Sequence, residues 1–255
     1  MILRNVTKHV KEQNWFAVGL DFFIVFFGVF VGLQVSDWSD ARNTDRQSAL
    51  FTKRLMADLR MEAFNNQALV EYYEDVLIHA GKALLVLEGK TMRSDEALMI
   101  SAYRASQDFG PPSHRTTYDE LTSTGSFNLI RDQVLRETVM KHYNEGFKFD
   151  RNSRYREAFR MAVSVEVQNT IAENCGDRAF ILGDYTTIVD ILDYDCTTGL
   201  SPEVLAAATN GLRADETIVP LLRLQIINMQ TMSDTRTRKS LNIQLGLKAV
   251  VGNKS

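Results

Sequence analysis

The sequence predicts an all-α protein: an N-terminal transmembrane helix that continues into an extracytoplasmic antiparallel helical bundle of three long helices plus short ones. Three observations favour this fold class. The run Trp15–Trp38 is apolar over about the 20 residues that a helix needs to cross a bilayer. Only four of the 255 residues are proline, and no glycine lies between Gly32 and Gly81. Apolar residues recur at intervals of three and four over long stretches, as on one face of a helix.

The membrane segment is the most specific feature of the chain. Every residue from Phe22 to Leu33 is apolar or glycine. Aromatic residues stand at both ends of the run, where amphipathic rings prefer the membrane interface. No A-x-A-like cleavage site follows the run, and a helical pattern continues beyond it, so we expect an uncleaved anchor rather than a signal peptide.

Four residues of this segment are candidates for helix packing in the membrane. Gly28 and Gly32 have the small-xxx-small spacing that lets two helix backbones approach closely, although glycine is also common in membrane helices in general. Asp21 is expected either to reach the headgroup layer or to pair with a partner helix, because an ionised carboxylate inside a bilayer is costly. Gln34 is expected at the interface. The predicted partners are the lipid bilayer and a second membrane subunit, either another protein or a copy of the chain itself.

Charges near the two ends of the segment predict its orientation. Three basic residues precede it and two follow it closely, which is a weak positive-inside bias: Arg4, Lys8 and Lys11 against Arg42 and Arg46. The residues before the segment are too few to fold on their own. We therefore expect residues 1–14 to be a short cytoplasmic tail, 15–38 the transmembrane helix, 39–251 an extracytoplasmic helical bundle domain, and 252–255 a frayed tail.

Part of the chain resembles a known family. The segment Ala17–Trp38, with its G-x-x-x-G-L-Q-x-x-x-W pattern, resembles the start of an uncharacterised bacterial family of single-pass membrane proteins. A second block of that family is similar to Tyr118–Leu121 together with Thr124–Gly125 and Leu129–Ile130. The resemblance implies a protein of the bacterial inner membrane with its main domain in the periplasm, and it implies no activity.

The charge of the chain gives no electrostatic case for nucleic-acid binding. The formal net charge is −3, and the first 20 residues carry three basic and one acidic side chain, which leaves −5 for the remainder. Nucleic-acid-binding domains are typically basic overall, whereas this outer domain is mildly acidic. The part behind the anchor is long enough for one domain with its own hydrophobic core.

Capping residues and helix breakers divide the outer domain. We expect three long helices, over 40–88, 131–174 and 215–250, to form the frame of the bundle. Shorter helices are expected over 95–108, after a capping box with Thr117 as the N-cap and Glu120 reaching back, and after Ser201. The helix after the capping box is expected to end near Gly125. The region 176–199 has no clear pattern.

Two cysteines, Cys175 and Cys196, lie in the domain that is expected outside the cytoplasm. An oxidising compartment favours a disulfide between them, and two buried thiols or one reactive thiol are the alternatives. Their spacing excludes a C-x-x-C motif, and no histidine lies near them in the sequence, so zinc is not expected. The acidic residues between them lack the spacing of a calcium-binding EF-hand loop.

One stretch of the second long helix is the best candidate for a binding surface. It interleaves aromatic residues with five basic ones: Lys148, Arg151, Arg154, Arg156 and Arg160. Guanidinium groups suit carboxylates and phosphates, and aromatic walls suit small ligands, so an anionic ligand or a partner is one interpretation. The other is a solvated helix face whose charges are partly balanced by Asp150 and Glu157.

The sequence contains no catalytic motif, no phosphate-binding glycine loop and no metal-ligand spacing, so we expect no enzyme, no cofactor and no metal. We predict a membrane-anchored periplasmic interaction module or accessory subunit of a membrane protein complex. The alternative is an extracytoplasmic ligand-binding sensor domain that signals through a partner. An enzyme would require the basic stretch to meet acidic residues and a histidine in a pocket.

Overall fold

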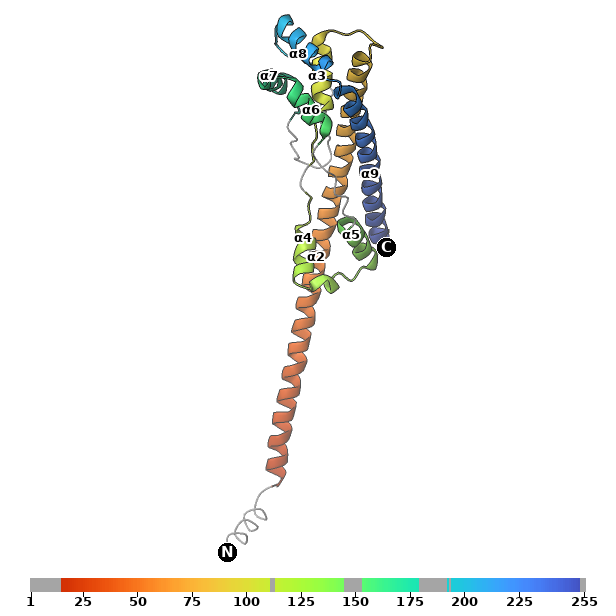
Figure 1. Ribbon diagram of the computed structural model, residues 1–255. Helices are drawn as coiled ribbons and strands as arrows, with labels where there is room; N and C mark the ends of the chain where they lie inside the picture. Colours follow the sequence, from red (N-terminus) through yellow and green to blue (C-terminus); the bar gives the residue numbers. More distant parts are fainter. Residues whose placement is uncertain (1–14, 111–112, 145–152, 179–191, 193, 253–255) are drawn as a thin grey trace. The chain divides into compact units, whose positions relative to one another are not determined.

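The computed structural model describes residues 15–110, 113–144, 153–178, 192 and 194–252, with the backbone alone for 15–19 and 21 (Figure 1). The described residues form eight α-helices and one 3-10 helix and contain no strand, so the all-α class is confirmed. The expected tail 1–14 and most of the unpatterned region 176–199 lie outside the described residues. The chain divides into two compact units, Met1–Thr52 and Lys53–Ser255.

The helix α2 (Trp15–Leu87) is uninterrupted over 73 residues, as the absence of proline predicts. It ends at Gly89, whose φ of +70° is a left-handed conformation that glycine adopts without steric cost. The backbone N–H of Gly89 donates to the Val86 carbonyl at 3.0 Å, and that of Lys90 donates to the Leu85 carbonyl at 2.9 Å. Together with the Glu88 N–H, which donates to the Leu84 carbonyl, these bonds satisfy three carbonyls in the last turn of the helix.

In the second unit, residues 53–87 of α2 pack against α9 (Ile218–Gly252). Hydrogen bonds join the two segments at Arg236 with Asn66 and at Ser240 with Ala63, and an ion pair joins Arg223 to Glu88, the residue directly after α2. In these bonded pairs the residue number rises along α2 while that of the partner in α9 falls, so the two helices are antiparallel (Figure 1). This pair is the frame of the bundle.

A hydrophobic core lies around the carboxyl end of α2. Four short helices enclose it: α3 (Asp95–Ala105), α6 (Arg154–Ala162), α7 (Val165–Cys175) and α8 (Pro202–Ala214). Its fully buried side chains include Leu98 and Met99 of α3, Phe159 of α6, Ile171 of α7 and Leu222 of α9. Burial of each such side chain contributes about 1.5–3 kcal/mol, which is why these helices are stable although each is short.

The predicted single long helix over 131–174 is wrong. The structure has three helices in its place: α5 (Gln133–Asn144), then α6 and α7, with residues 145–152 outside the described part. Serine caps start the last two, because Ser153 Oγ accepts from the Arg156 N–H and Ser164 Oγ from the Val167 N–H. Val163 between α6 and α7 is extended. A serine side chain can hydrogen-bond nearby backbone N–H groups, which favours the start of a new helix over the continuation of the previous one. The apolar stripe over 131–174 gives no indication of these two caps.

The predicted capping box at Thr117 is also wrong. The helix α4 (Thr116–Ser123) begins two residues earlier than this prediction requires, and Thr117 is a buried residue inside it. Its N-cap, Arg115, makes no side-chain capping hydrogen bond. The predicted end near Gly125 is confirmed, since Gly125 has a φ of +66° and precedes the 3-10 helix η1 (Ser126–Leu129).

Candidate functional site

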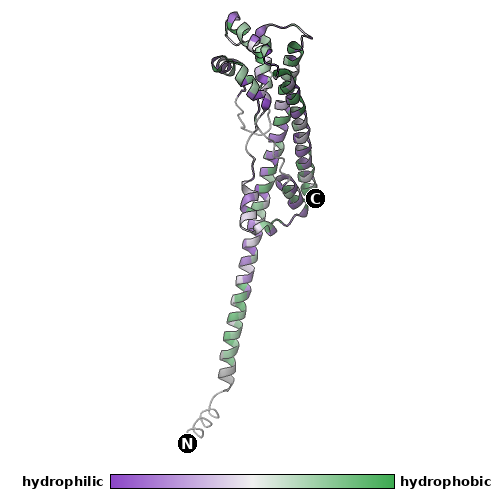
Figure 2. Cartoon of the chain, viewed as in Figure 1, coloured by the Kyte–Doolittle hydropathy of each residue, from purple (hydrophilic) through white to green (hydrophobic). Residues whose placement is uncertain are grey.

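The apolar segment of the first unit is exposed on every side of α2. Twelve large hydrophobic side chains between Leu20 and Val35 have exposed fractions from 49% to 70%. Successive residues of a helix point in directions about 100° apart, so a continuous exposed run covers the whole circumference. Figure 2 shows this apolar band along α2. Among the described residues, one helix is long and apolar enough to span a membrane, and this band is its apolar part.

Three of the four candidate packing residues can be placed on this segment. A Cβ atom added at Gly28 or Gly32 would meet nothing within 4 Å, so both backbones are open to an approaching helix. Gln34 is exposed on the same helix. The side chain of Asp21 lies outside the described part of the structure. At the far end, the Arg42 guanidinium lies 4.1 Å from the centre of the Trp38 ring.

Cys175 and Cys196 form a disulfide with a Cα–Cα distance of 5.5 Å. It joins the last residue of α7 to the segment that leads to α8. Disulfides persist in oxidising compartments and are rare in the cytoplasm, so this bond fits an extracytoplasmic domain.

A buried arginine holds this disulfide in place. The Arg104 side chain of α3 is 3% exposed, and its Nε donates to the Cys175 carbonyl at 3.1 Å while its Nη2 lies 3.3 Å from Cys196 Sγ. The same Nη2 donates to the Tyr194 carbonyl at 3.0 Å, and the Tyr194 ring lies 4.4 Å below the guanidinium. The sequence analysis missed Arg104, because nothing in its neighbourhood marks it as a residue that packs on a distant disulfide.

Two of the five residues of the basic stretch, Arg156 and Arg160, line one cavity. Arg154 is exposed, Arg156 is half-buried and Arg160 is exposed, while Lys148 and Arg151 lie outside the described residues. Arg156 and Arg160 line a cavity of about 410 Å³ whose other lining residues are Asp108, Phe109, Gly110, Ser153 and Glu157. The two carboxylates match the two guanidinium groups, so the cavity has no net charge.

Arg156 also acts on a buried acid. Asp177 accepts a hydrogen bond from the Tyr72 hydroxyl at 3.0 Å. Burial raises the pKa of Asp177 above its ordinary value, and the Tyr72 hydrogen bond and the charges of Arg156 and Arg104 offset part of this rise. Burial and the neighbouring Asp177 raise the pKa of Tyr72 well above its ordinary range. The positive charge of Arg156 therefore stabilises the ionised form of the Asp177 carboxylate inside the domain.

A second buried polar cluster centres on Glu62 of α2. One carboxylate oxygen pairs with His142 Nε2 at 2.9 Å, and the other accepts from the Ser113 hydroxyl at 2.9 Å and from the backbone N–H of His114. The side chains of Glu62 and His142 are 8% and 7% exposed. Burial by itself raises the pKa of Glu62, but the hydrogen bonds from His142, His114 and Ser113 outweigh it and hold the pKa below its ordinary value.

No protein-family model, no curated protein and no solved structure matches the chain. In the part of the chain that the structure describes, no group of three or more His, Cys, Asp or Glu residues is placed to hold a metal ion.

Proposed function

We propose that this protein is a membrane-anchored interaction module of the bacterial inner membrane, with residues 1–14 in the cytoplasm and the helical domain in the periplasm. The observation that carries the proposal is the exposed apolar band of α2, from Phe22 to Val35. In water such a contiguous band is far larger than the patches that monomeric soluble proteins tolerate. In a bilayer the same side chains face lipid, and every backbone group of the helix is satisfied within the helix.

The disulfide supports the placement of the helical domain outside the cytoplasm. Cys175 is completely buried, and the reducing cytoplasm would leave both thiols unpaired. The buried guanidinium of Arg104 lies against this disulfide and against carbonyl groups of the same region. A domain whose buried polar contacts are organised around a disulfide suits the periplasm.

The proposed role is that of an accessory subunit, without catalysis. Gly28 and Gly32 lie four residues apart in the exposed band, with no side chain to keep a second helix away. Small residues at this spacing allow close backbone contact between membrane helices. The resemblance of Ala17–Trp38 to a family of single-pass membrane proteins supports the same topology. The partner is a second membrane protein or a second copy of this chain.

A second candidate function is ligand sensing by the outer domain. The cavity lined by Arg156 and Arg160 favours it, because guanidinium groups in a concave site suit an anionic ligand. Against it stands the presence of two carboxylates, Asp108 and Glu157, in the same lining, which offset the charges of these arginines. The interaction module therefore remains the first proposal.

Topology is tested by protease treatment of spheroplasts that express the chain with a tag at each end. We expect digestion of the carboxyl-terminal tag, protection of the amino-terminal tag, and retention of the chain in the membrane after carbonate washing. Phe26→Asp with Phe27→Asp should release the chain, since a carboxylate at the centre of a membrane helix costs about 3 kcal/mol. Ile78→Asp with Leu241→Asp is the matched control and should stay in the membrane. Release of the unmodified chain would overturn the proposal.

The accessory role is tested by gentle extraction at native expression level and native mass measurement. A stoichiometric second membrane protein, lost on Gly28→Leu with Gly32→Leu, supports the role, and Asp21→Asn then tests the acidic residue. A homo-oligomer that the glycine double variant dissociates supports self-assembly. A lone monomer contradicts both forms of the proposal.

A further inference from the structure

The helix α9 has two distinct faces. One face is buried against the rest of the second unit and includes Leu222, Met229 and Ile243. The other face is exposed, and its residues follow one another in alternating steps of three and four, as in a heptad repeat: Ile227, Thr231, Asp234, Arg238, Leu241 and Leu245. We call these residues the outer stripe. At 1.5 Å per residue the outer stripe is about 27 Å long.

Both ends of the outer stripe are apolar. Ile227 is 59% exposed at one end, and Leu241 and Leu245 are 52% and 54% exposed at the other. The Thr231 hydroxyl donates to the Ile227 carbonyl at 3.0 Å, so its hydrogen bond is made within its own helix. Apolar residues in a heptad spacing on the outside of a helix are typical of a surface that packs on a second helix.

The centre of the outer stripe carries one charge of each sign. Asp234 and Arg238 are both exposed, and they lie four positions apart. Within the part of the chain that the structure describes, neither side chain has an ion-pair or hydrogen-bond partner. Because the two charges are opposite, the outer stripe is complementary to a second copy of itself.

The positions that flank the outer stripe carry no charge. They are the residues directly before and after the stripe positions on its two sides: Asn228, Gln230, Thr235, Thr237, Asn242 and Gln244. In coiled coils, charges at these positions decide which helices pair. Two identical helices with neutral flanks meet without repulsion between like charges, so the flanks favour a second copy of the chain as the partner.

We propose that the outer stripe of α9 packs against the outer stripe of a second copy of the chain, with the two α9 helices parallel. The parallel direction rests on the proposed function, because two copies anchored in one membrane are related by an axis along the membrane normal. In a parallel pair each stripe side chain inserts between four residues of the facing helix. The four residues around Asp234 then include Arg238 of the second copy, so the dimer gains two ion pairs.

The remaining stripe residues meet their own counterparts. Ile227, Leu241 and Leu245 bury apolar surface on either side of the ion pairs, and such burial stabilises the pair by about 25 cal/mol per Å². Anchoring both copies in one bilayer raises their effective concentration, so a short contact of this kind is sufficient. The contact is separate from Gly28 and Gly32, because the outer stripe lies in the second unit.

The first test is cross-linking of the full chain in liposomes of phosphatidylethanolamine and phosphatidylglycerol. Leu241→Cys should give a dimer with a short bismaleimide, because parallel helices bring the two introduced thiols together. Asn210→Cys, at an exposed position of α8, is the control and should not. An antiparallel pair with the same ion pairs would hold the thiols about 15 Å apart along the helices and leave them unlinked. A yield no higher than that of Asn210→Cys would overturn the proposal.

The second test exchanges the charges in the Leu241→Cys background. Asp234→Lys and Arg238→Glu should each lower the yield of dimer by about five- to tenfold, because each replaces two exposed ion pairs with like charges. The double variant Asp234→Lys with Arg238→Glu restores the pairing and should recover the yield. Glu74→Lys, at an exposed position of α2, is the control and should leave the yield unchanged. Unaltered yields in both single variants, or no recovery in the double variant, would contradict the ion pairs.

Failure of this proposal can be distinguished from failure of the proposed function. A chain that carbonate washing releases from the liposomes would contradict the membrane anchor. A chain that stays in the membrane and gives no dimer at Leu241→Cys would contradict the outer stripe alone. Persistence of the dimer in Gly28→Leu with Gly32→Leu would support the outer stripe as a contact of its own.

Discussion

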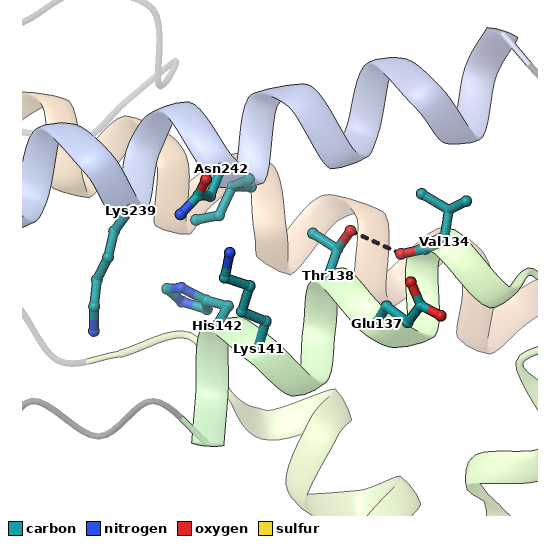
Figure 3. A pocket seen from close by; sticks show the side chains of 8 residues that line it. Val134, Glu137, Thr138, Lys141, His142, Lys239 and Asn242 are labelled. Carbon is teal, nitrogen blue, oxygen red and sulfur yellow. Dashed lines mark hydrogen bonds between the residues drawn. The ribbon is translucent and has the colours of Figure 1, made fainter.

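His142 Nε2 of α5 lies 2.9 Å from the Glu62 carboxylate of α2, and both side chains are more than nine-tenths buried. The two residues are 80 positions apart in the chain. Since an ionised carboxylate can only accept hydrogen bonds, Nε2 carries the proton that joins them. The pair connects the framework helix α2 to α5, and His142 also lines a cavity of about 230 Å³ between α5 and α9 (Figure 3).

Glu62→Gln is expected to destabilise the folded domain by about 3 kcal/mol, because it leaves buried donors facing a neutral amide. The urea-induced unfolding midpoint measures the loss. Glu120→Gln is the matched control, since Glu120 pairs with Arg54 at 2.7 Å but is 42% exposed. An exposed pair of this kind contributes about 1 kcal/mol or less. Equal losses in the two variants would contradict the assigned role of Glu62.

The same pair predicts a pH dependence. The pKa of Glu62 is lower in the folded domain than its ordinary value of 4.5. Its contribution to stability is therefore fully present above pH 4.5 and is lost as the pH falls through the lower folded pKa. Unfolding free energies measured between neutral pH and pH 3 should decline less steeply in Glu62→Gln than in the unmodified chain. Parallel profiles would be inconsistent with this prediction.

Loss of the disulfide is expected to cost about 3 kcal/mol, because the bond closes a loop of intermediate length in the unfolded chain. Cys175→Ala with Cys196→Ala tests this by denaturant unfolding, with the unmodified chain in reductant as a second comparison. Both should unfold at lower denaturant concentration than the oxidised chain. An unchanged midpoint in both would mean that the disulfide adds nothing to stability.

Arg104→Met is expected to destabilise the domain by about 3–5 kcal/mol. The substitution keeps much of the apolar stem but leaves the Cys175 and Tyr194 carbonyls without the donor that Arg104 provides. Arg223→Met is the control, because Arg223 makes a surface ion pair with Glu88 at 2.6 Å and its side chain is 60% exposed. Thermal unfolding should separate the two variants clearly, and similar midpoints would refute the prediction.

Gly246→Ala is expected to cost about 1–3 kcal/mol, the usual range for overpacking. A Cβ atom at Gly246 of α9 would lie 2.6 Å from Thr138 Cγ2 of α5 and still closer to Thr138 Oγ1. Gly81→Ala is the matched helical control, because its Cβ meets nothing within 4 Å. It should gain about 0.5–1 kcal/mol from the lower entropy of the unfolded chain.

The cause of the Gly246 effect can be tested with a second substitution. Thr138→Ala removes both of the closest atoms and should recover part of the loss in a double-mutant cycle. Additive effects of Gly246→Ala and Thr138→Ala would show that the two helices do not approach closely at this point.

Several elements could be predicted because their signals are local. The apolar run before Trp38, the left-handed glycine ends at Gly89 and Gly125, and the serine start of α8 each depend on residues within one or two turns of chain. The break of 131–174 into α5, α6 and α7 was missed because an apolar stripe continues across it. The caps at Ser153 and Ser164 decide where the helices begin, and serine is too common for either to be recognised from the pattern alone.

The helical class, the long apolar segment and the two cysteines as a possible disulfide could all be predicted from the amino-acid sequence, since hydrophobic period, the length of an apolar run and residue type are properties of short stretches. Which distant side chains come into contact depends on the folded arrangement of the helices. Glu62 contacts His142, the Ser113 hydroxyl and the His114 backbone N–H, and Arg104 contacts the disulfide. These contacts arise from how the helices pack, and packing depends on the whole set of buried surfaces rather than on any one segment.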